Sequence, residues 1–273
     1  MGASAEMAID KSEQFDRAVR LGFLARAAIY ILLGVLALAS SRQISDGPRA
    51  AFDAIGNVPG GTVLLWLVAI GLVAYALFRL ASPLFDIEHE GSDKTGWAKR
   101  IGHAGSAVGH LLLAWSAFQF ATTGTAADDS ARVQEVAAGV LSVNLGPVLL
   151  GLAGLAFLAT AVFQAREGLT GTFMNRISPR APRATRQIGA AGYCARAVVF
   201  AIIGWSLVQS AWSENSDGVK SIGSAITTLA DTGIAFDLLA VGLPLFGGFS
   251  LVLARYRTIP DMDVSGRIPA FRA

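Results

Sequence analysis

The sequence has few of the groups that most enzymes and soluble proteins need. Only 15% of its 273 residues are charged, and it contains three histidines and a single cysteine, Cys194. A soluble domain carries roughly a quarter charged residues, and one cysteine forms no internal disulfide, so the redox compartment is not indicated. His-Glu-x-x-His, Cys-x-x-Cys and a phosphate-binding glycine loop are all missing, as is a Ser-His-Asp arrangement in a motif context. We therefore expect no catalytic residue, no metal site and no cofactor.

Hydrophobic residues are abundant instead, at 53% of the chain with a mean hydropathy of +0.52. They gather in six stretches that are almost free of ionised groups: 21–40, 62–82, 101–121, 146–165, 189–211 and 234–254. Each is close to the ~20 residues that cross a bilayer as a helix. Lipid cannot satisfy open backbone groups, so long continuous apolar spans must be helical. The sequence predicts an all-α polytopic membrane protein with six transmembrane helices. Its polar first 20 residues lack a signal-peptide pattern, so we expect the first span to be retained.

The basic residues are distributed unevenly between the connections. Sixteen of the 22 Lys and Arg residues lie at the two ends of the chain and in the second and fourth connections. The other connections contain four, and Arg26 and Arg196 lie deeper inside the spans, while Arg79, near the end of its apolar stretch, is counted with the second connection. The positive-inside rule then places both termini in the cytoplasm. The basic segments lack interleaved aromatic residues, so nucleic acid is not an expected partner.

The same local pattern occurs twice at a spacing of 170 residues. One copy reads Gly22-Phe-Leu-Ala-Arg26-Ala-Ala-Ile-Tyr30-Ile-Leu-Leu-Gly34, and the other reads Gly192-Tyr-Cys-Ala-Arg196-Ala-Val-Val-Phe200-Ala-Ile-Ile-Gly204. A shift of 80 aligns a third segment, with Ser106 in the arginine position and His110 in the aromatic position. Repeats of this kind indicate three helical hairpins that enter the membrane in the same direction. Such parallel repeats are related by an axis along the membrane normal, here a pseudo-threefold axis.

The repeats divide the chain into seven parts. We predict hairpins over 21–86, 101–168 and 188–257, with a cytoplasmic N-terminal arm at 1–20, linkers at 87–100 and 169–187, and a tail at 258–273. The outer loops each contain a segment that can form two or three amphipathic helical turns, which we expect to lie on the outer surface.

The repeated opening resembles a known bacterial family, the membrane proteins called domain of unknown function 1206. The family pattern resembles Gly-x-x-Ala-Arg-x-x-x-Tyr, matched by Gly22, Ala25, Arg26 and Tyr30, and again from Gly192 with Phe200 in place of tyrosine. The middle repeat departs from it at Ser106 and His110. The resemblance implies three tandem two-helix repeats and a place in the bacterial inner membrane. It implies no activity.

Arg26 and Arg196 are the first candidate site. An ionised residue inside a span is expensive and a functional suspect. Arg26 lies only five residues beyond Leu21, about 8 Å at 1.5 Å per residue, so its side chain can reach the headgroups. One interpretation is a structural arginine that bonds a neighbouring helix. The other is a pocket for an anionic lipid or solute formed by Arg26, Arg196 and Ser106.

Other polar residues within the spans form a second candidate site. His103, Ser106 and His110 share one face of the third span, and Gln119 and Gln164 lie within the third and fourth spans. Together they are candidates for a polar intramembrane face that relays protons or lines a path. A histidine bonded to a neighbouring helix is the simpler interpretation. The spans contain no acidic residue near their middle, which argues against a proton-coupled transporter.

The third feature of the sequence is its glycine content, 30 of 273 residues. Small residues let helices approach closely in lipid, and we predict this packing role for seven of them: Gly22, Gly34, Gly102, Gly105, Gly109, Gly192 and Gly204.

The sequence favours a non-enzymatic scaffold or accessory component that contacts lipids, including anionic ones, or partner helices. The first alternative is a small transporter or channel along the pseudo-threefold axis. The second is a membrane enzyme that acts on lipid.

Overall fold

The computed structural model describes residues 3–39, 47–85, 94–125 and 128–258. Within these ranges six long helices dominate: α1 (Ala3–Ala39), α4 (Gly61–Phe85), α5 (Lys94–Thr123), α7 (Gly146–Thr170), α8 (Thr185–Ser213) and α10 (Ile234–Tyr256). The described residues include no strand, only an isolated bridge between Ile177 and Arg257. The all-α prediction is confirmed.

Several of the predicted boundaries fall inside helices, since residues 20, 100, 168 and 187 lie within α1, α5, α7 and α8. The N-terminal arm is continuous with the first span, because α1 already begins at Ala3. The linker at 169–187 contains the end of α7, a 3-10 turn η1 (Thr172–Arg176) and the start of α8. Residues 87–93 of the first linker and 259–273 of the tail lie outside the described residues.

Five of the six long helices are long and apolar enough to cross a membrane. They are found at Asp16–Ala39, Gly61–Ala81, Gly146–Thr170, Thr185–Ser213 and Ile234–Tyr256. The exception among the described residues is α5, although it has 30 residues. Its apolar stretch is interrupted by His103, His110 and Gln119 and diluted by three glycines. The structure therefore supports a membrane protein with five candidate spans, and the sixth predicted span does not meet the same criterion.

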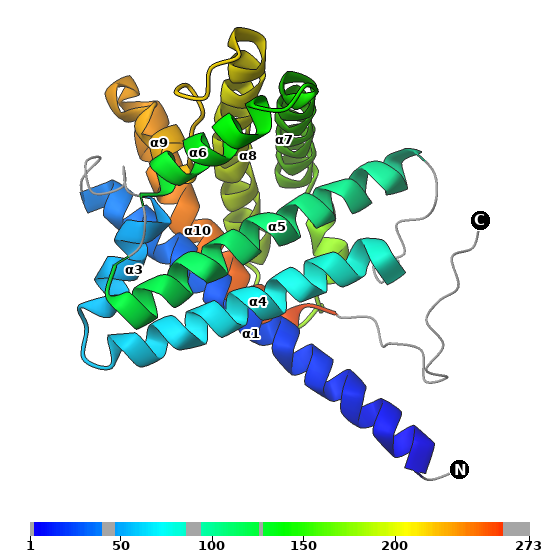
Figure 1. Ribbon diagram of the computed structural model, residues 1–273. Helices are drawn as coiled ribbons and strands as arrows, with labels where there is room; N and C mark the ends of the chain where they lie inside the picture. The colour runs from blue at the N-terminus through cyan, green and yellow to red at the C-terminus, as the bar shows by residue number, and fades with distance from the viewer. Residues whose placement is uncertain (1–2, 40–46, 86–93, 126–127, 259–273) are drawn as a thin grey trace.

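The long helices pack in the order α5, α4, α1, α10, α8, α7. The first and last helices are neighbours at the centre, and Figure 1 shows α5 lying along α4 on one side and α7 along α8 on the other. The middle hairpin is thus divided, since α5 packs on the first hairpin and α7 on the third. Among the described residues, α5 and α7 have no extensive contact with each other. The predicted threefold arrangement is not established by this packing.

Short helices cover one end of the bundle, toward the upper left of Figure 1. They are α3 (Pro48–Gly56), α6 (Asp129–Leu141) and α9 (Ile222–Thr227), followed by η2 (Ala230–Thr232). The predicted helical turns in the outer loops are therefore confirmed. The side chain of Asp128 caps α6 by accepting from the Ser130 and Ala131 amides, and a capping box formed by Ser221 and Ser224 begins α9. Apolar side chains such as Phe52 and Ile226 are fully buried beneath these helices.

Two contacts join α6 to the loop before α9. The Gln134 amide donates to the carbonyl of Asp217 at 2.8 Å, and the Ser130 and Ser221 hydroxyls lie 3.0 Å apart. These contacts join the outer connection of the middle hairpin to that of the third.

The opposite end is closed by the linker after α7. The Ser178 amide donates to the Tyr256 carbonyl at 2.8 Å, and the Thr258 amide donates to the Arg176 carbonyl at 3.0 Å. Phe173 of η1 is buried, with its ring centroid 5.0 Å from that of Phe249. The linker is therefore anchored against the end of α10.

Large apolar side chains remain exposed along the helices. Val63, Val162 and Leu238 are 63%, 68% and 69% exposed. A water-soluble protein rarely leaves so much contiguous apolar surface uncovered. This surface is the physical reason to treat the chain as a membrane protein.

Candidate functional site

Arg26 lies deep inside the bundle, where α1 meets α4 and α10. Its side chain is 3% exposed. Nε donates to the Ser250 hydroxyl at 3.1 Å, and Nη1 donates to the Tyr75 hydroxyl. The guanidinium carbon also lies 4.9 Å from the ring centroid of Phe23, 4.9 Å from that of Tyr75 and 4.8 Å from that of Phe246. The arginine is enclosed by protein and does not extend to headgroups.

Arg196 occupies the corresponding place on α8. It is 8% exposed, and its guanidinium carbon lies 4.4 Å from the Phe246 ring centroid. Phe200 of the same helix and Tyr30 of α1 contribute further rings at 4.9 and 5.4 Å. Phe246 therefore contacts both arginines.

These side chains form the arginine–aromatic cluster, which we define as Arg26, Tyr30, Tyr75, Arg196 and Phe246. Aromatic faces attract a cation by about 2 kcal/mol or more once water is excluded. Neither arginine has an acidic partner among the described residues, and Arg26 Nη2 and Arg196 Nε are buried without a hydrogen-bond acceptor. The cluster is cationic and held by ring faces and two hydroxyls rather than by ion pairs.

The third repeat position differs. Ser106 is half-buried, and its carbonyl lies 2.7 Å from His110 Nδ1. The His110 ring centroid lies 4.5 Å from that of Tyr75. His110 therefore borders the cluster, whereas Ser106 bonds within its own helix. The structure brings together two of the three residues predicted for an anion pocket.

The remaining polar candidates do not converge on one place. Gln119 accepts from Arg132 of α6 at 2.6 Å, toward the covered end of the bundle. Gln164 on α7 is buried with both amide atoms unbonded among the described residues. His103 is half-buried near the other end of α5. The predicted polar face therefore does not form a continuous line.

Four of the predicted packing glycines lie in close contact with a facing helix. A Cβ atom on Gly22 would lie 2.6 Å from Tyr75 Cβ, and one on Gly192 would lie 2.6 Å from Phe246 Cα. Gly34 abuts Pro244 of α10, and a Cβ on Gly204 would lie 2.9 Å from the Gly154 carbonyl of α7. Any larger residue at these positions requires the facing helix to move.

The middle repeat departs from this expectation. A Cβ on Gly102 would lie 4.0 Å from Thr160 Oγ1, and no atom lies within 4 Å of a Cβ built on Gly105 or Gly109. Within the described structure Gly105 and Gly109 therefore have no facing helix, and their packing role stays a prediction. The reason is that α5 and α7 do not close on each other.

The sequence pattern did not identify the partners of the arginines. Tyr75, Phe246 and Ser250 lie on the second helices of the hairpins, where the repeat pattern is weaker. The structure shows that Gly22 faces Tyr75 and Gly192 faces Phe246 in matching places, a correspondence that the sequence alone did not mark. No group of three or more His, Cys, Asp or Glu residues in the described part of the chain is arranged to hold a metal ion.

Comparison with known proteins agrees with the repeats. The family described as Domain of Unknown Function (DUF1206) matches residues 21–85, 101–171 and 191–257. A relative from Bacillus subtilis (strain 168), called "Uncharacterized protein YxxB", is 30% identical over 248 residues, which cover 87% of this chain and 90% of that protein. No solved structure matches. The three matched ranges follow the three hairpins read from the sequence, and the chain belongs to the DUF1206 family.

Proposed function

We propose that this protein is a six-span, non-enzymatic membrane component that binds lipids or a partner helix around a closed centre. The observation that carries the proposal is the arginine–aromatic cluster. Phe246 fills the space between Arg26 and Arg196, and all three side chains are at least nine-tenths buried. A centre packed in this way suits a rigid scaffold better than a conducting path.

The proposal counts α5 as the sixth span. Its 30 residues extend over roughly 45 Å, more than the ~30 Å of hydrocarbon. Val108, Leu111 and Trp115 are 58%, 43% and 54% exposed, whereas His110 and Ser116 are buried. The apolar outer face suits lipid and the polar face is turned toward protein. An even number of spans puts both termini on one side, the cytoplasmic side by the positive-inside rule.

Matching contacts support a threefold relation between the hairpins. Gly22 faces Tyr75, Gly192 faces Phe246, and Gly102 has Thr160 as its nearest neighbour. The same pair of positions therefore meets in each hairpin, loosely in the middle one. We propose three hairpins around one axis, of which the middle one is open between α5 and α7. That opening is the surface available to lipid or a partner helix.

A transporter is the second candidate, because the interior retains polar atoms without partners. Gln164 Nε2 and Oε1, Arg26 Nη2 and Arg196 Nε are all buried and unbonded among the described residues. Unpaired groups of this kind within spans are costly and mark solute paths in many membrane proteins.

Reconstitution distinguishes the two candidates. The purified full chain is placed in vesicles that carry a pH-sensitive dye and a potassium gradient. The scaffold proposal expects proton and potassium flux no higher than in empty vesicles, and a stoichiometric lipid retained on the protein in native mass spectrometry. Flux that is lost in Gln164→Ala would overturn the proposal and favour the transporter.

Topology is tested separately, by cysteine labelling in a Cys194→Ser background. New cysteines replace Asn57, Thr125 and Arg180 one at a time, all of which are exposed. With six spans, the first two positions face the outside and the third faces the cytoplasm. We expect a membrane-impermeant thiol reagent to label Asn57→Cys and Thr125→Cys from the same side, and Arg180→Cys from the other. Labelling of Asn57→Cys and Thr125→Cys from opposite sides contradicts the sixth span, because α5 is the crossing that returns the chain to the outside.

A further inference from the structure

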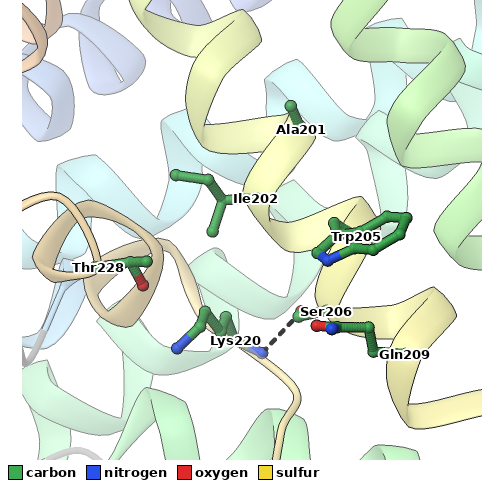
Figure 2. A pocket seen from close by; sticks show the side chains of 7 residues that line it. All are labelled: Ala201, Ile202, Trp205, Ser206, Gln209, Lys220 and Thr228. Carbon is green, nitrogen blue, oxygen red and sulfur yellow. Dashed lines mark hydrogen bonds between the residues drawn. The ribbon is translucent and has the colours of Figure 1, made fainter. Parts of the chain in front are cut away.

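A cavity lies outside the arginine–aromatic cluster, on the opposite face of α8. It has a volume of about 400 Å³, within the range of small-molecule sites. Five lining residues come from α8, namely Ala201, Ile202, Trp205, Ser206 and Gln209. Lys220 from the loop before α9 and Thr228 at the end of α9 complete the wall. Figure 2 shows the side chains around this space.

The cavity has a polar side and an apolar side. Lys220, Gln209 and Thr228 offer an ammonium, an amide and a hydroxyl, while Ala201, Ile202 and Trp205 are apolar or aromatic. The Lys220 amide donates to the Ser206 hydroxyl at 3.1 Å, which fixes the loop against α8. The ammonium has no bonded acceptor among the described residues, so the positive charge is available to a ligand.

The position suits the membrane interface. The cavity lies toward the end of α8 that is covered by the short helices, and Trp205 is 57% exposed. Tryptophan is enriched at the level of the headgroups, where one end of a side chain is wet and the other is in lipid. Val198, one turn before Ile202 on α8, is 42% exposed and continues the apolar surface toward the hydrocarbon.

The lysine distinguishes this hairpin from the other two. The residues before the N-caps of α3, α6 and α9 are Asp46, Ala127 and Lys220. Arg132, another base at this end, donates to Ser116 and Gln119 at 2.6 Å each and is already engaged. Within the part of the chain that the structure describes, an uncommitted cation beside an apolar groove is therefore found at this end only in the third hairpin.

We propose that this cavity binds one phospholipid with an anionic headgroup. Its phosphate would lie against Lys220 and Gln209, and an acyl chain would follow Ala201, Ile202 and Trp205 along α8. The Thr228 hydroxyl already donates to the Ser224 carbonyl at 2.8 Å, so this residue would only border the headgroup. An ammonium gives a charge-assisted contact to phosphate, stronger than a neutral hydrogen bond. The inference rests on the proposed function, because it names the lipid class and the place where it binds.

The test measures lipid binding to the full chain in detergent by native mass spectrometry. Phosphatidylglycerol and phosphatidylcholine of equal chain length are titrated against wild type, Lys220→Met and Lys220→Arg. We expect Lys220→Met to weaken phosphatidylglycerol binding by about tenfold, equivalent to ~1.4 kcal/mol, and to weaken phosphatidylcholine less, because its choline cation already offsets the phosphate charge. Lys220→Arg keeps the charge and should remain within about threefold of wild type.

A matched pair of tryptophans tests the apolar wall. Trp205→Ala should weaken binding of both lipids, whereas Trp212→Ala, on the same helix, 92% exposed and outside the cavity, should not. Thermal melts without added lipid check that the variants fold. Wild-type affinity for phosphatidylglycerol in Lys220→Met overturns the proposal. Competition by inorganic phosphate as effective as by lipid overturns the lipid assignment in favour of a soluble anion. Neither result bears on the flux assay, so the two proposals fail separately.

Discussion

The first and third hairpins close tightly, and the middle one does not. In the first, Arg26 reaches across to Tyr75, and in the third, Arg196 stacks on Phe246. In the middle hairpin Ser106 stands in the arginine position, and the nearest atom to a Cβ built on Gly102 is Thr160 Oγ1 at 4.0 Å. All three hairpins have the glycine that allows close approach, so glycine alone does not close a hairpin.

The difference points to the arginine and its aromatic partner as the closing contact. In lipid there is little hydrophobic drive to bring two apolar helices together, so packing and polar contacts must do it. A buried guanidinium that lies against rings of both helices supplies such a contact, and Ser106, whose contacts are with His110 of its own helix, does not. The following predictions test this comparison, from the largest expected effect to the smallest.

Arg26→Ser copies the middle repeat into the first hairpin. It removes the donor to Ser250 and the cation that contacts three rings, and it leaves a void. Loss of these ring contacts and the cavity left behind cost about 2–5 kcal/mol. Unfolding of the purified protein in detergent, followed by circular dichroism, measures the loss. Arg166→Ser on the exposed side of α7 is the control and should change stability by less than about 0.5 kcal/mol.

Gly192→Ala and Gly109→Ala compare the tight contact between α8 and α10 with the open side of α5. The new methyl would lie 2.6 Å from the Phe246 backbone, and overpacking of this kind costs about 1–3 kcal/mol. Gly109→Ala, where no atom lies within 4 Å, should be neutral or stabilising by up to about 1 kcal/mol from helix propensity. The same unfolding assay compares the two. Equal losses would show that α5 and α7 close as tightly as the other hairpins.

Tyr75→Phe removes only the hydroxyl that accepts from Arg26 and from Arg79 Nε at 3.0 Å. The ring contacts remain, so we expect a loss of about 1–3 kcal/mol, the cost of leaving a buried donor unsatisfied. Tyr30→Phe is the matched control, because the Tyr30 ring contacts Arg196 while its hydroxyl has no bond among the described residues. A melt of both variants gives the comparison, and similar losses would mean that the hydroxyl is not the important group.

Ser106→Ala should have the smallest effect. The Ser106 hydroxyl lies 3.5 Å from His110 Nδ1, a weak contact, and the carbonyl that His110 meets at 2.7 Å is unaffected. We expect a change within about 0.5 kcal/mol. A loss comparable to that of Arg26→Ser would contradict a merely local role for Ser106.

The repeats and the apolar runs predicted the helices well, because both are local properties of the chain. The pairing of helices could not be predicted in the same way. Arg26 meets Ser250, 224 residues away, and nothing in the local pattern identifies that acceptor. Gly105 and Gly109 lack a facing helix in the described residues for a related reason. Their spacing was right for packing, but packing depends on the facing helix, and α7 lies against α8 instead.

The contact between α1 and α10 sets an order of biogenesis. The acceptor for Arg26 Nε is Ser250, which is translated 224 residues later, roughly 10–45 s at 5–20 residues per second. During that interval Arg26 has Tyr75 and Phe23 beside it in the first hairpin, but it lacks Ser250 and Phe246 of α10. The first hairpin therefore completes its native contacts only after the last helix has been made.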